Sequence, residues 1–162
     1  MTIETIEVPG KGFFTAVWNM RGLEQLLFPG EIRAPRLSVE RNSGCLPGWH
    51  AVLDANLRAY FCGRPVDFSG IPVDLKGYTP FQAQVLSFIR GLPFGSVSTY
   101  GQVAGGIGRP GGARAVGQAL GRNRTPIIIP CHRVLGSRSI GGFSSGLSWK
   151  ETLLRLEGFE GT

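Results

Sequence analysis

Cys131 and His132 stand side by side in the chain, flanked by Pro130 and Arg133. A cysteine thiolate is a strong nucleophile, and a nearby imidazole can take the thiol proton. Adjacent residues of an extended strand point to opposite faces, so the two side chains can cooperate only if the chain turns here or a water molecule bridges them. The dipeptide alone more often marks a buried structural cysteine beside an unrelated histidine. His132 is, however, the only histidine apart from His50, and it lies where basic residues are densest, which favours the chemical interpretation.

The positive charge of the chain is concentrated in its second half. The 162 residues carry a formal net charge of +6. Residues 1–78 hold eight basic and eight acidic side chains and are neutral, whereas residues 79–162 hold nine basic and three acidic ones, a net of +6. No acidic residue lies between Asp74 and Glu151. Such a field suits a polyanion such as nucleic acid, and a generally basic surface is the simpler alternative.

The composition excludes several classes of protein. Hydrophobic residues make up 42% and charged residues 17% of the chain, as in globular proteins. Residues 1–10 lack the apolar run of a signal peptide, and no stretch approaches the roughly 18 apolar residues of a membrane span, so we expect a cytoplasmic protein without a membrane partner. An odd count of three cysteines argues against a disulfide framework.

Neither a metal nor a cofactor is expected. Cys45, His50 and Cys62 fit no standard zinc spacing and have no fourth candidate ligand beside them. The chain also lacks the glycine-rich dinucleotide fingerprint and the phosphate-binding P-loop.

The first half reads as a small antiparallel sheet followed by one helix. Three short apolar runs, at residues 3–8, 13–18 and 23–28, are separated by Gly and Pro. A loop rich in Pro, Ser and Gly follows at residues 34–48, and residues 49–61 have the apolar spacing of an amphipathic helix. We expect these elements to form a domain over residues 1–76, in which no catalytic constellation is visible.

The second half, residues 79–158, reads as a mostly helical domain. Thr79-Pro80 is an N-cap followed by proline at the first helical position, and Gly91 ends that helix. The capping box Thr99–Gln102 opens a short helix to about Ile107. Further expected elements are a helix from Pro110 to about Arg122, a buried run at 126–130, and a last helix opened by a capping box at Ser148–Glu151 and closed by Gly158.

The helices at 99–107 and 110–122 predict a helix-turn-helix whose second helix is the recognition helix. Residues 111–119 of that helix are almost all small and surround a single arginine, Arg114. The DNA minor groove is about 6 Å wide, whereas a helix with ordinary side chains is about 10–12 Å across. A helix of small residues can bring its backbone close to a shallow or widened groove, and the arginine can then enter the base stack. Tight packing between helices also favours small residues, but it does not account for the lone arginine.

The segment around Cys131 and several motifs near it resemble those of a known family. The segment Ile129-Pro-Cys-His-Arg-Val134 is similar to the active-site signature of the O6-alkylguanine-DNA alkyltransferases. The other matching motifs, in the family's order and spacing, are Thr99-Tyr100, Arg114-Ala-Val-Gly117, Asn123, Gly141–Gly146, Lys150 and Leu153–Gly158. The resemblance is strong from about residue 79 to residue 158 and only general before that.

The resemblance implies a DNA-repair protein that flips O6-alkylguanine out of DNA and transfers the alkyl group irreversibly to Cys131, restoring guanine in a single turnover without a cofactor. His132 would take the thiol proton through a water molecule, and Glu157 would orient and charge-balance the imidazole. Asn123 would connect the recognition helix to the active-site turn. Tyr100 would donate a proton or a hydrogen bond to the departing guanine.

The same resemblance implies the DNA contacts and the substrate pocket. Arg114 would fill the gap left by the extruded base. The implied DNA-binding residues are Thr99, Tyr100, Gly112, Ala113, Arg114, Ala115 and Gln118, and the implied pocket residues are Pro126, Val134, Phe143, Ser144 and Ser145. The chain departs from the family at Phe143, where many members have tyrosine, at Arg124, where proline is usual, and at Ser145, which replaces a common glycine. These departures bear on the preferred size of the alkyl group and not on the reaction.

The implied fold class is α/β (α+β). It combines a small ribonuclease H-like sheet-and-helix domain with a winged-helix-like domain that contains the helix-turn-helix, and the implied form is a monomer bound to DNA. One alternative is an alkyltransferase-like protein that flips alkylguanine and recruits other repair factors, but those relatives lack the cysteine that Cys131 provides. The other is a helix-turn-helix transcription factor, which would need a dimer interface or a cysteine-rich sensor domain that the sequence does not show.

Overall fold

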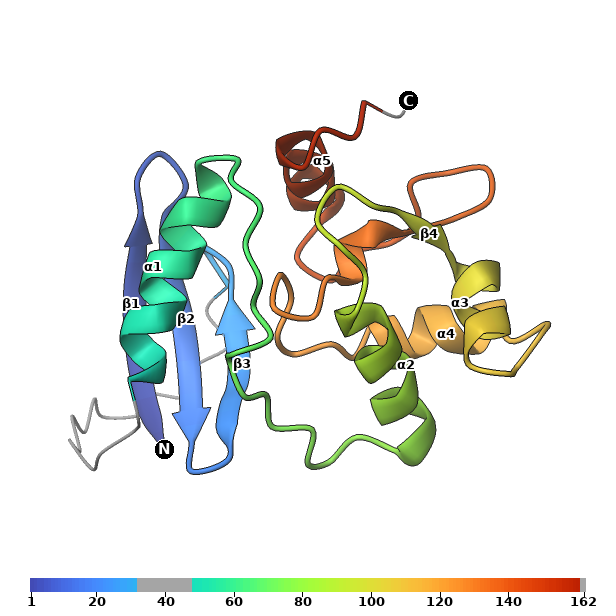
Figure 1. Ribbon diagram of the computed structural model, residues 1–162, viewed down its shortest axis with the longest axis horizontal. Coiled ribbons are helices and arrows are strands. Elements are labelled where there is room, and N and C mark those ends of the chain that lie inside the picture. Colours follow the sequence, from blue (N-terminus) through green and yellow to red (C-terminus); the bar gives the residue numbers. More distant parts are fainter. Residues whose placement is uncertain (32–47, 161–162) are drawn as a thin grey trace. The chain divides into compact units, whose positions relative to one another are not determined.

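The first half of the chain folds as a three-stranded antiparallel sheet with one helix lying across it (Figure 1). The computed structural model describes residues 1–31 and 48–160. The strands pair in the order β1-β2-β3, and the elements are β1 (Thr2–Val8), β2 (Gly12–Asn19), β3 (Gly22–Leu27) and α1 (Trp49–Phe61). The predicted strands and helix are confirmed, and the helix has the predicted bounds. The predicted loop at 34–48 lies outside the described residues except for Gly48.

Burial along the strands explains why this segment forms a sheet with one covered face. Ile6 and Val8 on β1 are buried, and Thr5 and Glu7, which alternate with them, are exposed, as period-two alternation requires. On β2 the register shifts between Val17 and Trp18, so both of these neighbours are buried. Together with the buried side of α1 they form the core of a compact unit, Met1–Asp74.

The second compact unit, Leu75–Thr162, is mostly helical. Its elements are α2 (Pro80–Arg90), β4 (Ser98–Thr99), α3 (Tyr100–Gly106), α4 (Ala113–Leu120), a 3₁₀ turn (Cys131–Arg133), β5 (Val134–Leu135) and α5 (Leu147–Leu156). The helices α2, α3 and α4 pack against one another. β4 and β5 pair in parallel and were not predicted, because strands of two residues carry no readable periodicity.

In the second unit, two helix starts agree with the sequence and two do not. The capping boxes of Thr79 and Thr99 are both formed. The helix predicted from Pro110 begins at Ala113 instead, because Gly111 adopts a positive φ of 85° and Gly112 is the N-cap. The capping box predicted at Ser148 is wrong: α5 already begins at Leu147, after Gly146 with a φ of 98°, and no side chain caps it.

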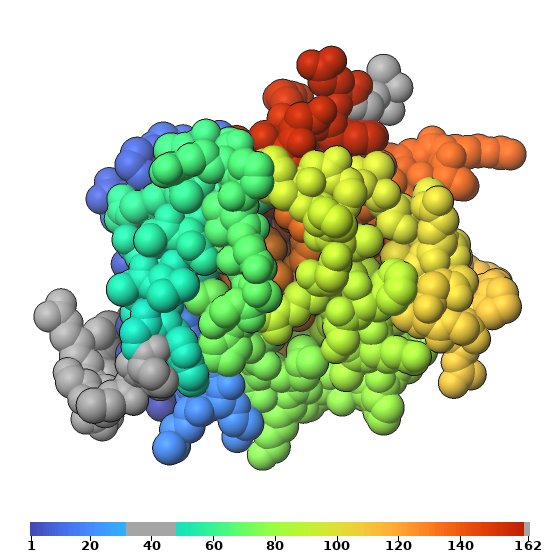
Figure 2. Space-filling view, in the orientation of Figure 1, coloured from blue at the N-terminus to red at the C-terminus, as the bar shows by residue number. Residues whose placement is uncertain are grey.

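Two surface features of the second unit bear on its function. The segment between β5 and α5, drawn in orange, stands out from the rest of the unit (Figure 2). The turn between α3 and α4, residues 107–112, is largely exposed.

Within the described ranges, no helix has the length and apolar character needed to cross a membrane.

Candidate active site

Cys131 opens the 3₁₀ turn Cys131–Arg133, and this turn brings the cysteine and the histidine into one site. The backbone N–H of Arg133 donates to the Pro130 carbonyl at 3.0 Å, which closes the turn. The Cys131 side chain is buried at 6% exposure, and His132 is completely buried. The two neighbours therefore do not point to opposite faces of a strand, and both are withdrawn from bulk water.

The turn that precedes the cysteine is strained. Ile127 is a β-branched residue with a φ of 74°, a conformation that such side chains rarely adopt. It is fully buried, and the N–H of Ile129 closes the turn by donating to the Thr125 carbonyl at 2.9 Å. A conformation of this kind persists only where the surrounding structure enforces it. The backbone leading to Cys131 is thus held firmly by its surroundings.

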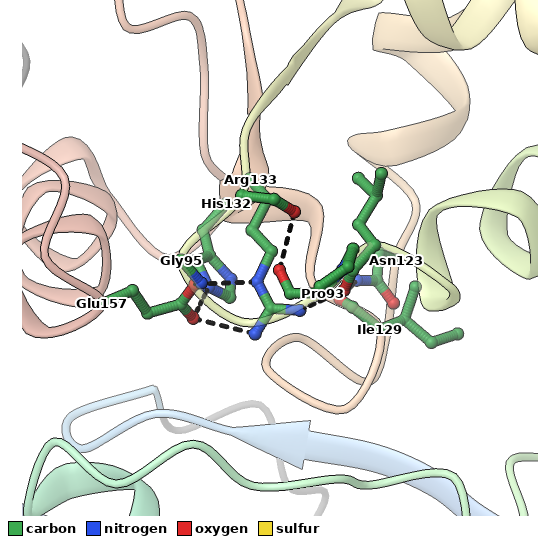
Figure 3. A network of polar contacts seen from close by, with 9 residues as sticks. Pro93, Gly95, Asn123, Ile129, His132, Arg133 and Glu157 are labelled. Atoms are coloured by element: carbon green, nitrogen blue, oxygen red, sulfur yellow. Dashed lines mark hydrogen bonds and ion pairs between the residues drawn. The ribbon is translucent and has the colours of Figure 1, made fainter.

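Asn123 provides much of that enforcement (Figure 3). Its Nδ2 donates to the Ile129 carbonyl at 2.8 Å and to the Sγ of Cys131 at 3.1 Å. Its Oδ1 accepts from the N–H of Thr125 at 3.0 Å. Because Asn123 lies three residues after Leu120, the last residue of α4, its amide joins the end of that helix to the turn that carries the cysteine.

Glu157, at the C-terminal end of α5, joins His132 to Arg133 (Figure 3). Its Oε1 lies 2.7 Å from the Nε2 of His132 and accepts from the Nη2 of Arg133 at 3.0 Å. Its Oε2 accepts from the Nε of Arg133 at 2.8 Å and from the N–H of Gly95 at 3.0 Å. Since Nε2 is engaged with the carboxylate, a proton taken from the thiol has to go to the other ring nitrogen, Nδ1.

The electrostatics keep both members of the Cys131–His132 pair neutral at rest. Burial raises the pKa of the Cys131 thiol, and the hydrogen bond from Asn123 and the charge of Lys150 oppose that rise. Burial likewise lowers the pKa of His132, against the opposing effect of Glu157. A neutral imidazole can accept a proton, and the adjacent carboxylate stabilises the imidazolium that results. These shifts favour a neutral thiol in the resting protein and a thiolate that forms only when His132 takes the proton.

Arg133 and Lys150 have places in this site that the sequence analysis did not assign. Lys150 is fully buried, and its Nζ donates to the carbonyls of Val134 at 2.7 Å and Gly142 at 3.1 Å. Burial lowers the pKa of Lys150 to about 8, opposed by its interaction with Cys131. Both residues stand inside motifs that the sequence displays, but nothing in a sequence shows that a lysine or an arginine is buried.

A cavity of about 270 Å³ opens beside Cys131. It is lined by Tyr100, Gly117, Leu120, Gly121, Cys131, Gly142, Phe143 and Ser144. Of the expected pocket residues, Phe143 and Ser144 line it, whereas Pro126, Val134 and Ser145 do not. Pro126 and Val134 are buried on either side of the Cys131 turn. The helix end at Leu120 and Gly121 takes their place in the wall, which the sequence did not reveal because the contact depends on how α4 packs.

Tyr100 presents a protonated hydroxyl to this cavity. Burial raises its pKa, and a backbone hydrogen bond from Gly142 opposes the rise. Gly141 lies so close that a Cβ there would stand 2.7 Å from the Tyr100 hydroxyl oxygen, and its φ is 76°. Only glycine fits this position. The phenol thus keeps its proton at neutral pH and is held against the loop that closes one side of the cavity.

The comparisons with known proteins agree with this chemistry. The family model described as "6-O-methylguanine DNA methyltransferase, DNA binding domain" matches residues 80–159. A methylated-DNA–protein-cysteine methyltransferase of Shigella flexneri is 45% identical over 121 residues, which are 74% of this chain and 68% of that protein. One from Mycobacterium tuberculosis is 39% identical over 147 residues, 90% of this chain and 82% of its own length. The chain belongs to the methylated-DNA–protein-cysteine methyltransferase family.

Solved structures of such methyltransferases share the architecture. The crystal structure of Mycobacterium tuberculosis OGT in complex with DNA superposes with a TM-score of 0.80 at 34% identity, covering 97% of this chain and 92% of that one. The O6-methylguanine DNA methyltransferase from Methanococcus jannaschii gives 0.67 at 28% identity, covering 98% and 95%. The predicted mixed α/β class, with a small antiparallel sheet and several helices, is confirmed.

In this methyltransferase, α4 presents the small-residue surface expected of a recognition helix. Arg114, Ala115 and Gln118 are exposed, and Gly112 and Ala113 are half-buried. Within the described part of the chain, no hydrogen bond or ion pair holds the Arg114 side chain. The hydroxyl of Thr99 accepts from the N–H of Gln102 as the cap of α3, so its first role is structural. Tyr100 and Gly117 both line the cavity, which places the inner side of α4 next to Cys131.

Proposed function

We propose that this methyltransferase repairs alkylated DNA by flipping O6-alkylguanine into the cavity and transferring the alkyl group irreversibly to Cys131. One observation carries the proposal. Cys131 lines a cavity of about 270 Å³, its Sγ is hydrogen-bonded by Asn123, and the residue that follows it, His132, is paired with Glu157. A nucleophile in the wall of a substrate-sized cavity is therefore followed directly in the chain by a candidate base and the carboxylate that orients it.

The reaction balances among these groups and the substrate. The proton of the Cys131 thiol passes through a water molecule to Nδ1 of His132, and Glu157 stabilises the imidazolium. The thiolate attacks the alkyl carbon, so that a C–S bond forms as the C–O6 bond breaks. The bonding electron pair leaves on guanine, where Tyr100 supplies a hydrogen bond or a proton. No electrons are gained or lost overall, so the reaction requires no cofactor.

The product explains why each molecule would act once. A thioether has no good leaving group, and neither water nor His132 can cleave it under ordinary conditions. The protein is consumed with the lesion, and the amount of repair equals the amount of active protein.

The DNA-binding part of the proposal rests on α4. Its small residues let the backbone approach the minor groove, with Thr99, Tyr100, Gly112, Ala113, Ala115 and Gln118 near the DNA and Arg114 inserted where the flipped base was. A structure of the Mycobacterium tuberculosis relative in complex with DNA supports DNA as the partner. Phe143 and Ser144 would contact the alkylated base, with Pro126, Val134 and Ser145 behind them.

The proposal extends to the type of each domain, the cellular location and the oligomeric state. We infer a ribonuclease H-like domain over residues 1–76 and a winged-helix-like domain with a helix-turn-helix over residues 79–158. The support is the sheet-and-helix unit at the start of the chain and the α3–α4 pair with its flanking β4 and β5. We further propose a cytoplasmic monomer, as suits a protein that needs a single site and one DNA duplex.

Alkyl transfer should add one methyl group per protein molecule. After exposure to excess O6-methylguanine DNA, the intact mass should rise by a single methyl group, and peptide mapping should place it on Cys131. The Cys131→Ala variant, which keeps the other cysteines, should show no increase. A methyl group on Cys62, or repeated turnover by one protein molecule, would exclude the proposed reaction.

Binding to undamaged duplex DNA should depend strongly on salt. Of the nine basic residues in 79–162, Arg133 and Lys150 are buried, so at most seven can contact phosphates. Each phosphate contact releases counterions, so log affinity should fall linearly with log salt, with a slope of about −0.9 per contact. Fluorescence anisotropy with a labelled duplex measures this slope. A flat response would show that charge does not drive the association.

A further inference from the structure

The hydroxyl group of Tyr78 joins the two peptide groups on either side of Asn123. It donates to the carbonyl of Arg122 at 3.0 Å and accepts from the backbone N–H of Arg124 at 2.9 Å. Tyr78 precedes α2 by two residues and is far from Asn123 in the sequence. A single side-chain oxygen thereby fixes the backbone both before and after the asparagine.

The side chain of Arg124 completes this arrangement. Its Nε donates to the same Tyr78 hydroxyl at 3.2 Å, and its guanidinium carbon lies 4.5 Å from the centre of the Tyr78 ring. Its Nη2 donates to the Lys76 carbonyl at 2.8 Å. The segment before α2 and the segment after α4 are therefore tied together at this point. We call Tyr78 and Arg124 the clamp.

What the clamp holds is the residue that hydrogen-bonds the nucleophile. Nδ2 of Asn123 contacts Cys131 Sγ at 3.1 Å, and this bond opposes the effect of burial on the thiol. A hydrogen bond weakens steeply when its angle or length is disturbed. Asn123 can support the thiolate only while its backbone stays in place, and Tyr78 bonds to the peptide groups on both sides of it.

We propose that Tyr78 and Arg124 are positioning residues that set the reactivity of Cys131 through Asn123. This deepens the proposed function and rests on it. The clamp touches neither the cavity nor the sulfur, so its effect on the thiol must pass through the asparagine. Its loss should leave the chemistry intact but displace it to higher pH, because a thiol that loses a hydrogen bond to its anion is harder to ionise.

The test uses the full chain with Tyr78→Phe, which removes only the bridging oxygen, and Arg124→Ala, which removes the guanidinium but keeps the backbone N–H. Arg122→Ala is the matched control, because it removes a neighbouring exposed positive charge whose side chain is not part of the clamp. Reaction with free O6-benzylguanine is followed against pH, so that DNA binding does not enter. Alkylation of Cys131 by iodoacetamide, mapped by mass, is followed over the same range.

Tyr78→Phe should slow both reactions about three- to tenfold at neutral pH, the size expected for one lost hydrogen bond, and the deficit should shrink as the pH rises. Arg124→Ala should act in the same direction, and Arg122→Ala should match the parent. Adding Tyr78→Phe to Asn123→Ala should have no further effect, because the clamp acts through that asparagine. If Tyr78→Phe does not fold, Arg124→Ala carries the same comparison.

Three results would overturn the proposal. They are an unchanged pH profile in a clamp variant that has merely lost thermal stability, an equal shift in Arg122→Ala, and additive losses in the Asn123→Ala background. Failure of the proposed function is distinguishable from these. In that case the parent protein does not react with O6-benzylguanine, while the iodoacetamide profile still reports whether the clamp affects Cys131.

Discussion

Arg114→Ala should slow repair of O6-methylguanine in duplex DNA about ten- to a hundredfold, because extrusion of the base then costs the full few kcal/mol of unstacking. The arginine side chain is exposed on α4 and is held by no polar contact within the described residues, so its removal should leave stability unchanged. The free base O6-benzylguanine needs no flipping and should react with the variant at the parental rate. Single-turnover kinetics with both substrates provide the measurement.

The matched control for Arg114 is Arg109→Ala, which removes an exposed positive charge from the turn before α4. Both variants should weaken duplex binding only a few-fold, since one such contact is worth roughly 1–3 kcal/mol at most. Only Arg114→Ala should slow reaction with the duplex substrate while leaving the rate with the free base unchanged. If it slows both substrates equally, Arg114 belongs to the scaffold of the active site and does not fill the gap left by the flipped base.

Glu157→Gln should slow alkyl transfer at least about a hundredfold, within the usual range for losing base catalysis, while DNA affinity stays within a few-fold. The carboxylate lies 2.7 Å from Nε2 of His132 and supports its positive charge when the thiolate forms. A neutral amide cannot give that support. The measurements are the rate of transfer to Cys131 and duplex affinity on the same preparations.

The structure adds a control that this experiment needs. Glu157 also pairs with the buried Arg133, and breaking a buried pair typically costs about 3–5 kcal/mol of stability. Arg133→Met breaks the same pair but leaves the His132–Glu157 contact in place. It should destabilise the protein to a similar degree and slow transfer far less. Equal losses of rate in the two variants would make Glu157 a structural residue.

The sequence predicted those elements whose signals are local. The helix at 49–61 and the capping boxes at Thr79 and Thr99 were placed correctly, because apolar spacing and capping chemistry act over a few residues. Pro110 and Ser148 were misplaced as helix starts. Both have the right residue type, but glycines with positive φ set the true boundaries at Ala113 and Leu147.

The site itself was only partly accessible to sequence reasoning. The motifs marked Cys131, His132 and Asn123, whose side chains the structure brings to one turn, and the roles proposed for them await the experiments above. The burial of Lys150 and the pairing of Arg133 with Glu157 depend on packing between segments distant in the sequence. The lining of the cavity by Leu120 and Gly121 depends on the same packing. No local pattern encodes such contacts.

The long reach of the Glu157 contacts links the reactivity of the cysteine to the completeness of the fold. This carboxylate accepts a hydrogen bond from Gly95, 62 residues earlier, and contacts His132, 25 residues earlier. The imidazole therefore gains its carboxylate only when the end of α5 has packed against two segments that are distant in the sequence. A molecule in which α5 is undocked keeps the nucleophile but lacks the carboxylate that supports its base.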